Sequence, residues 1–235
     1  MKPDLQKLIR QNEILIEPAQ FKQLETYVDL LLDWNKKINL ISRKDEGQIW
    51  INHILLSLSF CFQFHFPRRS RILDIGTGGG LPGIPLSILY PDTEFLLTDS
   101  IRKKARAVES MINVLGLKNV SIAWARAEEL QASSEFRPFD TVIARSVSVI
   151  TNLASWSLPL LRSVAAETPV PPSGKLLLPA PALVSLKGGD IAGEIREAIR
   201  VHPGAVFEVI AFSFVGQESL LNQDKKFVVV WKKPF

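Results

Sequence analysis

The most constraining feature of this sequence is a short apolar strand that runs directly into a cluster of glycines, within residues 71–85. Its apolar residues are too few for a helix and predict a buried strand that ends near Ile75. Four of the five positions 76–80 are then glycine, and Gly76, Gly78 and Gly80 among them allow backbone angles that a Cβ would forbid. Glycines at this density weaken a regular element, which makes sense where a ligand approaches the main chain closely. We therefore expect a ligand-binding turn and a helix that begins near Pro82, with free N–H groups facing the ligand.

Two classes of nucleoside cofactor fit such a turn. Residues 78–83 satisfy the G-x-G-x-x-G pattern of nicotinamide dinucleotide sites, which by itself is weak evidence. Counted from Gly76, where the strand ends, the third glycine position falls on Leu81 instead. Asp74 would also repel a pyrophosphate, whereas its carboxylate would favour the cationic methionyl end of S-adenosylmethionine. The charge argument favours the sulfonium cofactor, and a nicotinamide-dependent oxidoreductase stays as the second reading.

Composition limits the class of protein. With 235 residues, of which 46% are hydrophobic, the chain can bury one substantial core. The best candidate for a membrane span, residues 51–66, is interrupted by six polar side chains, so no membrane partner is predicted. The sequence starts without a hydrophobic signal segment, and its single cysteine, Cys61, lies in an apolar stretch. We expect a cytoplasmic protein with Cys61 in the core, and three scattered histidines suggest no metal site.

The order of the predicted elements indicates an α/β fold. Residues 1–66 predict an N-terminal helical cap, and residues 67–235 a Rossmann-like domain that forms one compact unit with it. After the first strand, the pattern predicts strands at 95–98, 120–124 and 139–144 and helices at 102–115, 152–164 and 191–200. Either 176–178 or 183–186 supplies a fifth strand, and 206–214 with 227–231 predicts an antiparallel pair. A proline-rich stretch within 167–182 predicts an exposed insertion.

Candidate site residues follow the strands, because ligands of an open parallel sheet bind at the carboxyl ends of its strands. Asp99 lies 19 residues beyond Gly80, a distance suited to a carboxylate that accepts from both ribose hydroxyls, although it could instead cap the next helix. Backbone groups around Ala127 and Glu128 are placed to read an adenine edge. Arg145 ends the fourth strand, where an arginine is costly to desolvate without an acidic or phosphate partner.

Basic residues indicate a polyanionic partner. The net charge is only +4, but Arg102, Lys103 and Arg106 crowd the start of one helix, where the helix dipole disfavours cations. Further basic pairs include Lys36–Lys37 and Lys225–Lys226. Any one such pair is more often a solvated surface than a binding site, but together they suggest phosphate contacts with a polynucleotide.

Together these residues resemble the glucose-inhibited division protein B family, which comprises small-subunit ribosomal RNA guanine-N7 methyltransferases. The resemblance spans about residues 20–235. Its most specific part is the glycine loop at 76–85, and the other matching segments are 34–36, 39–40, 53–55, 99–100, 126–129, 139–145 and 186–188. This sequence departs from the family pattern at Leu56, where an aspartate is usual, and at Gly79, where a proline is common.

The resemblance implies a class I methyltransferase fold, S-adenosylmethionine as the methyl donor and guanine N7 of 16S-type ribosomal RNA as the acceptor. It implies that Arg145 orients substrate or cofactor and that basic residues dock the RNA, for which Lys36, Arg102, Lys103, Arg106 and Lys187 are the candidates. The implied cofactor-binding residues are Asp74, Gly76, Gly78, Leu81, Asp99, Ser100, Ile101, Ala127, Glu128 and Arg145.

Guanine N7 carries a lone pair and no proton, so the implied reaction needs positioning rather than a general base. The implied partner is the small ribosomal subunit, its assembly intermediate or its free RNA, and we expect a monomer. A ribosomal RNA binding or assembly factor without catalysis is the alternative from a different functional class.

Overall fold

The computed structural model describes residues 4–66, 69–132, 134, 136–163, 175–178, 181–216 and 224–233. Its α-helices are α1 Leu5–Gln11, α2 Pro18–Asn35, α3 Leu56–Gln63, α4 Gly83–Leu89, α5 Arg102–Leu115, α6 Ile150–Ser157 and α7 Ala192–Val201. Shorter helices are the 3₁₀ segments η1 Arg43–Gln48, η3 Ala127–Ala132 and η4 Leu158–Leu160 and the π-helix η2 Trp50–Leu55. The strands are β1 Phe64–His65, β2 Arg71–Ile75, β3 Glu94–Asp99, β4 Val120–Trp124, β5 Thr141–Arg145, β6 Leu176–Leu177, β7 Ala182–Gly188, β8 Ala205–Ala211 and β9 Lys225–Lys232.

The central sheet has seven strands in the order β4-β3-β2-β5-β7-β9-β8. The first five in this order run parallel, and β9 pairs antiparallel with both β7 and β8. This confirms the predicted α/β sheet with its C-terminal antiparallel pair. The chain moves outward from β2 to β4 and then returns to β5 on the other side of β2. A crevice at this reversal, between the carboxyl ends of β2 and β5, is the usual ligand position in such sheets.

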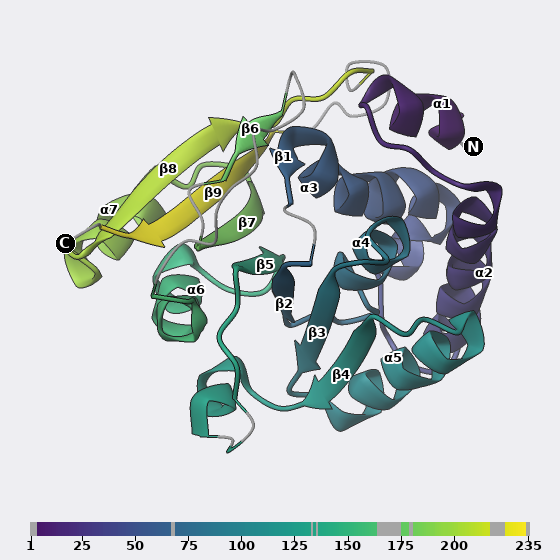
Figure 1. The fold of residues 1–235 in the computed structure, drawn as a ribbon, viewed down its shortest axis with the longest axis horizontal. Coiled ribbons are helices and arrows are strands. Elements are labelled where there is room, and N and C mark those ends of the chain that lie inside the picture. Colours follow the sequence, from purple (N-terminus) through teal and green to yellow (C-terminus); the bar gives the residue numbers. More distant parts are fainter. Residues whose placement is uncertain are drawn as a thin grey trace.

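Helices cover both faces of the sheet, as the alternation of buried strand residues requires. Ile72 and Ile143 belong to one apolar cluster, which also takes in residues of α1–α5. Leu73 and Val142, next to them in the chain, belong to a second cluster with α6 and α7. Figure 1 shows α2, α4 and α5 gathered on one side of β2–β4 and α6 and α7 near the C-terminal hairpin. The result is a three-layer arrangement with β2 and β5 near its centre.

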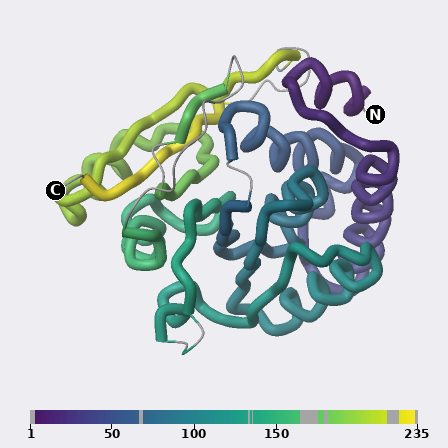
Figure 2. Tube along the Cα trace, viewed as in Figure 1, coloured from purple at the N-terminus to yellow at the C-terminus, as the bar shows by residue number. Residues whose placement is uncertain are grey.

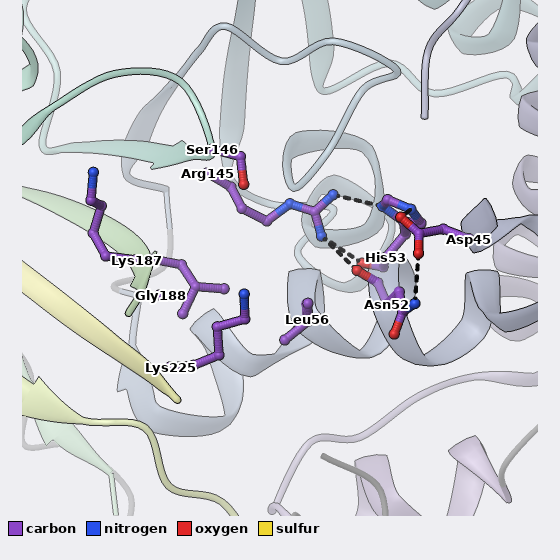
Figure 3. A pocket seen from close by; sticks show the side chains of 10 residues that line it. Asp45, Asn52, His53, Leu56, Arg145, Ser146, Lys187, Gly188 and Lys225 are labelled. Atoms are coloured by element: carbon purple, nitrogen blue, oxygen red, sulfur yellow. Dashed lines mark hydrogen bonds and ion pairs between the residues drawn. The ribbon is translucent and has the colours of Figure 1, made fainter. Parts of the chain in front are cut away.

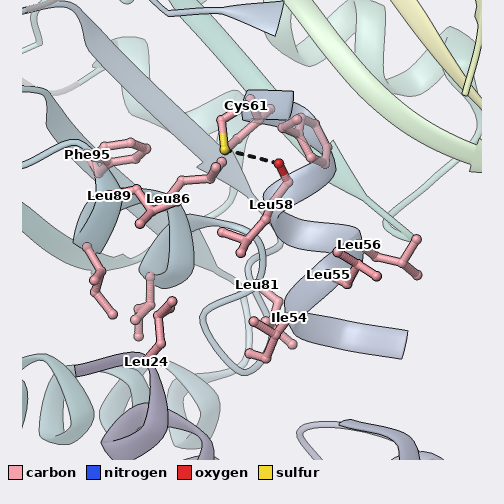
Figure 4. Packing of buried hydrophobic residues seen from close by; sticks show 14 of the residues in the cluster. Leu24, Ile54, Leu55, Leu56, Leu58, Cys61, Leu81, Leu86, Leu89 and Phe95 are labelled. Atoms are coloured by element: carbon pink, nitrogen blue, oxygen red, sulfur yellow. Dashed lines mark hydrogen bonds between the residues drawn. The ribbon is translucent and has the colours of Figure 1, made fainter. Parts of the chain in front are cut away.

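The N-terminal helices share their core with the sheet. Figure 4 shows side chains from α2, η2, α3, α4 and β3 packed together, among them Leu24, Ile54, Leu58, Leu86 and Phe95. Cys61 is fully buried there and its Sγ donates to the carbonyl of Leu58, so its expected place in the core is confirmed. Among the described residues, no helix combines the length and the apolarity needed to cross a lipid bilayer.

Two predicted elements differ clearly from those observed, and the alternative left open for the fifth strand is resolved. The helix expected over 152–164 is wrong at both ends, because α6 starts at Ile150 and ends at Ser157, just before Pro159, which cannot continue an α-helix. The segment 183–186 supplies the fifth strand of the sheet, as β7, whereas 176–177 pairs with β1 in a separate two-stranded sheet. β8 ends at Ala211, short of the predicted 214. Most of the proline-rich stretch lies outside the described residues.

The segment after α1 is joined to the segment after β8 by the side-chain amide of Asn12, which makes two hydrogen bonds with the backbone of Val215 as a neighbouring strand would. The Nδ2 of Asn12 donates to the carbonyl of Val215 at 3.1 Å, and the N–H of Val215 donates to Asn12 Oδ1 at 3.0 Å. Next to this pair, a Cβ at Gly216 would come within 2.6 Å of Leu8. In Figure 2 the purple helix α1 accordingly lies beside the chain that follows β8. The docking of α1 therefore depends on residues about two hundred positions later.

Candidate active site

Asp74 shapes the glycine loop from beneath. Its Oδ2 accepts from the Thr77 hydroxyl at 2.7 Å and from the Gly83 N–H at 2.9 Å, and the side chain is fully buried. The N–H of Ile84 donates to the Gly80 carbonyl. The expectation of free N–H groups at the start of this helix is therefore wrong, because Asp74 and the loop itself take them.

Space beside the loop is open at one glycine. A Cβ at Gly76 would lie 2.8 Å from Val147, and one at Gly79 would lie 2.8 Å from Leu31, so both face packed side chains. At Gly78 the nearest atom would be the Leu40 carbonyl at 3.9 Å. Gly78 also has a φ of 60°, which favours glycine. A ligand that approaches the main chain therefore fits best at Gly78.

Asp99 ties the loop to the end of β3. Its Oδ2 accepts from the Gly78 N–H at 3.0 Å and its Oδ1 accepts from the Ile101 N–H at 2.8 Å. The second bond supports the start of α5, whose N-cap residue Ile101 has no side-chain cap of its own. The first bond goes to the glycine loop, so Asp99 has a role beyond capping this helix. An ionised carboxylate offers about four acceptor positions, which leaves capacity for ligand hydroxyls beside these two bonds.

The segment after β4 lies beside the end of β3, because Asp99 and Trp124 are partners in the register of these two strands. Ala127 is buried at the start of η3, whereas Glu128 is exposed and its Oε1 lies 4.0 Å from the Arg126 guanidinium. Ser100 and Ile101 are exposed after β3. The Trp124 indole N–H donates to the Ser100 carbonyl at 3.1 Å, which fixes an exposed ring at the edge of the sheet. Trp124 was not among the predicted site residues, although it stands at the end of a predicted strand.

These observations fit a cofactor that is cationic at one end and carries a ribose at the other. Asp74 Oδ1 is buried and has no hydrogen-bond partner, so a buried carboxylate oxygen is left over close to the loop. Asp99 has acceptor capacity where a ribose would meet it, and Gly78 leaves the main chain approachable. Of the other predicted loop residues, Leu81 is buried, with only 5% of its surface exposed, whereas Gly76 is partly exposed, as Gly78 is.

Arg145 ends β5 and binds the N-terminal helices across the crevice. Its Nη1 donates to the carbonyls of His53 at 3.2 Å and Asn52 at 3.4 Å, and its Nη2 lies 3.0 Å from His53 Nδ1 (Figure 3). The two carbonyls belong to the π-helix η2, and π-turns of this kind recur at functional sites. The acidic or phosphate partner expected for Arg145 is replaced here by carbonyls and a histidine.

The contact with Arg145 also fixes the tautomer of His53. A guanidinium has only donors, so Nδ1 accepts and the ring proton lies on Nε2. Nε2 faces Asp45 Oδ2 at 3.4 Å without meeting hydrogen-bond geometry, and Asp45 Oδ1 accepts from Asn52 Nδ2 at 2.9 Å. Burial and the neighbouring Arg145 lower the pKa of His53 to about 4, against the opposing effect of Asp45. His53 is therefore a neutral supporting residue at neutral pH.

Tyr27 holds the loop from above, and its loss should loosen it. Its hydroxyl donates to the Gly79 carbonyl at 2.9 Å in a fully buried setting. We expect Tyr27→Phe to lower the free energy of unfolding by about 1–3 kcal/mol, because a buried carbonyl loses its partner. Urea unfolding of the variant checks this. Tyr90→Phe removes the hydroxyl of another tyrosine, whose ring packs on Phe66, and serves as the comparison. Equal stability of Tyr27→Phe and wild type would contradict the hydrogen bond from Tyr27 to Gly79.

Asp74 should make stability depend on pH. Burial raises the pKa of this carboxyl from 3.8 to about 7, although Thr77, Gly83 and Arg145 lower it. Between these two values the folded state holds a proton that the unfolded state has lost, so stability falls as pH rises from 3.8 to about 7 and is flat above it. Asp74→Asn removes this contribution. We therefore expect the variant to gain stability relative to wild type over that interval in urea unfolding, and a constant difference would contradict the raised pKa.

The predicted RNA-contacting residues do not form one cluster. Arg102, Lys103 and Arg106 are exposed on α5, and the Arg102 guanidinium lies 4.9 Å from the ring centre of Trp124. Lys187 lies at the end of β7, which is separated from β4 by three strands, or about 19 Å at the usual strand spacing. Its Nζ lies 2.9 Å from Glu194 and donates to the Ser148 carbonyl, so its charge is paired within the chain. Lys36 is exposed and pairs with Asp33 at 2.8 Å.

Comparison with known proteins identifies the family. Residues 20–166 match the profile of GidB, described as rRNA small subunit methyltransferase G. The chain belongs to this family. The ribosomal RNA small subunit methyltransferase G of Chlorobium phaeobacteroides is 40% identical over 85% of this chain and 81% of its own length. The protein of the same name from Bacteroides fragilis is 42% identical over 74% of this chain and 78% of its own length.

Solved structures share the fold with this GidB-family chain at low sequence identity. A SAM-dependent O-methyltransferase from Thermotoga maritima superposes with a TM-score of 0.53 at 12% identity, covering 89% of this chain and 72% of that one. A mutant of MtNAS gives 0.54 at 14% identity, covering 92% and 75%. The fold is that of class I S-adenosylmethionine-dependent methyltransferases. Within the described residues, no group of three or more histidine, cysteine, aspartate or glutamate side chains could hold a metal ion.

Proposed function

We propose that this chain transfers the methyl group of S-adenosylmethionine to N7 of a guanine in small-subunit ribosomal RNA. One structural observation carries the proposal: the carboxyl ends of β2 and β3 bring Asp74 and Asp99 to the two sides of a glycine loop that is open at Gly78. Membership of the GidB family and the names of its relatives support the choice of ribosomal RNA as acceptor.

The chain's own residues would position two ligands. S-adenosylmethionine supplies an electrophilic methyl group on a sulfonium. Asp99 would accept from the ribose, Gly78 would lie against the main body of the cofactor, and the free oxygen of Asp74, in the ionised form that prevails above about pH 7, would favour its positive end. Guanine N7 attacks with its lone pair and gives up no proton, so the site needs no base. The low pKa of His53 agrees with this, because an imidazole with a low pKa is a weak base and its Nδ1 already accepts from Arg145.

A methylation assay tests the proposal. Purified full-length chain is given labelled S-adenosylmethionine together with either unmethylated small-subunit RNA or assembled small subunits. We expect label in alkali-labile 7-methylguanine and release of S-adenosylhomocysteine. Cofactor and RNA binding without label in guanine would instead indicate a binding or assembly factor. Binding of a nicotinamide dinucleotide in place of S-adenosylmethionine would indicate an oxidoreductase.

A further inference from the structure

A polar pocket lies at the carboxyl ends of β5 and β7. Its volume is about 250 Å³ and it lies among the segments that carry Arg145, Lys187 and Lys225 (Figure 3). The lining continues through Ser146, and Val147, the next residue, packs against Gly76 of the loop. A ligand in this pocket therefore lies next to the proposed methyl-donor site. At this volume, below the range of about 300–1,000 Å³ for drug-sized ligands, a single small group is the natural occupant.

The charged lining is positive overall. Three cationic side chains, Arg145, Lys187 and Lys225, face one anionic side chain, Asp45. Asp45 already interacts with Asn52 and His53, so it is not placed to neutralise the lysines. An anionic group is therefore the ligand that this lining favours.

The three cations differ in what they have left to donate. Arg145 donates to two carbonyls and to His53, and Lys187 is paired with Glu194 and with the Ser148 carbonyl. Across the part of the chain that the structure describes, no acceptor contacts the Lys225 ammonium. Lys225, at the start of β9, is half-buried and thus holds a charge whose donors are available to a ligand.

Gly188 lets this lysine reach the pocket. It lies opposite Lys225 in the register of β7 and β9, and a Cβ at Gly188 would come within 3.1 Å of the Lys225 Nζ. The lysine side chain thus passes close over a position without a side chain, and Figure 3 shows its ammonium directed toward the space between Gly188 and Leu56. The next residue, Lys226, is committed elsewhere, with its Nζ 3.0 Å from Asp224 and donating to the Gly189 carbonyl.

We propose that this pocket binds a backbone phosphate of the acceptor RNA strand and that the Lys225 ammonium is its main contact. The inference rests on the proposed function, which makes RNA the acceptor. A lysine ammonium binds phosphate as a compact point charge, whereas an uncharged base would leave the positive lining uncompensated. A phosphate held here would place the neighbouring nucleotide beside the glycine loop. Lys225 lies outside residues 20–166, the part that matches the family profile.

The test compares two neighbouring lysines in the full chain. Affinity for a small-subunit RNA transcript is measured between about 50 and 200 mM salt, where affinity that depends on phosphate contacts falls steeply. Lys225→Met and Lys226→Met are the matched pair of variants. For Lys225→Met we expect about tenfold weaker binding and a salt dependence shallower by about 0.7 in log–log slope, the value for one contact to a single strand. Lys226→Met should match wild type, and Lys225→Arg should restore the slope.

Cofactor affinity separates the two anions that could enter this pocket. If the carboxylate of S-adenosylmethionine were the ligand, Lys225→Met would weaken cofactor binding and leave the RNA slope unchanged, which would overturn the proposal. An unchanged RNA slope with normal cofactor binding would overturn it as well. Absence of methylation by the wild-type chain, combined with a Lys225-dependent RNA slope, would refute the proposed reaction and leave the phosphate site standing.

Discussion

Replacing Asp99 with alanine is expected to weaken S-adenosylmethionine binding about a hundredfold, since hydrogen bonds to a charged group contribute about 1.5–3 kcal/mol. The variant loses the proposed acceptor of the ribose hydroxyls. It also leaves the N–H groups of Gly78 and Ile101 without their partner, so the loop itself loses support. Isothermal titration of cofactor into the purified chain measures the effect, and thermal melting monitors the accompanying loss of stability.

Two further variants make the Asp99 result interpretable. Asp99→Asn keeps one acceptor oxygen and should give an intermediate affinity. Asp29→Ala removes an exposed carboxylate on α2 and should bind cofactor as wild type does. If Asp99→Ala melted at a lower temperature but retained full cofactor affinity, Asp99 would be a residue of the loop alone and would leave the binding site.

Arg145→Met should reduce the rate constant of methyl transfer about a hundredfold, the loss that follows from misplacing reacting groups by about 1 Å. Methionine keeps an unbranched side chain but cannot donate to η2 or to His53. Arg145→Lys should not restore activity, because one ammonium cannot reproduce a fork that reaches two carbonyls and a ring nitrogen. A single-turnover methylation assay with saturating RNA separates this effect from weaker docking.

Arg200→Met is the matched control, since Arg200 is an exposed arginine on α7 that pairs only with Glu197 among the bonds described. It should leave both cofactor affinity and methyl transfer unchanged. Retained activity together with retained cofactor affinity in Arg145→Met would remove Arg145 from the site and leave it a link between β5 and η2.

Local patterns were enough to predict the elements that carry the cofactor site. The helix 102–115 was predicted with both ends correct, because its apolar spacing is regular and Gly116 ends it in the left-handed conformation. The strand before the glycine loop ends at Ile75 as predicted. Where a proline interrupts an apolar pattern, as at Pro159, the pattern overestimated the helix.

Contacts between segments that are far apart in the chain could not be predicted from the sequence. Arg145 was identified from its place at a strand end, but the sequence could not show that its partner is His53, 92 positions earlier. Asp74 was expected to face a ligand, and only the packed structure shows one of its oxygens closing the loop. Lys225 and Lys226 look alike in the sequence, and it is the register with β7 that directs one to Gly188 and leaves the other paired with Asp224.

The bond between Asn12 and Val215 has a consequence for how the protein is made. During synthesis α1 leaves the ribosome before β8, and the backbone groups that Asn12 pairs with are added 203 residues after it. At about 5–20 residues per second, α1 waits on the order of 10–40 seconds for its binding surface. Throughout that time the apolar side of the helix, with Leu5 and Ile9, has no finished core to enter. The final docking of α1 is therefore a late event, which can occur only after β8 and Val215 have been synthesised.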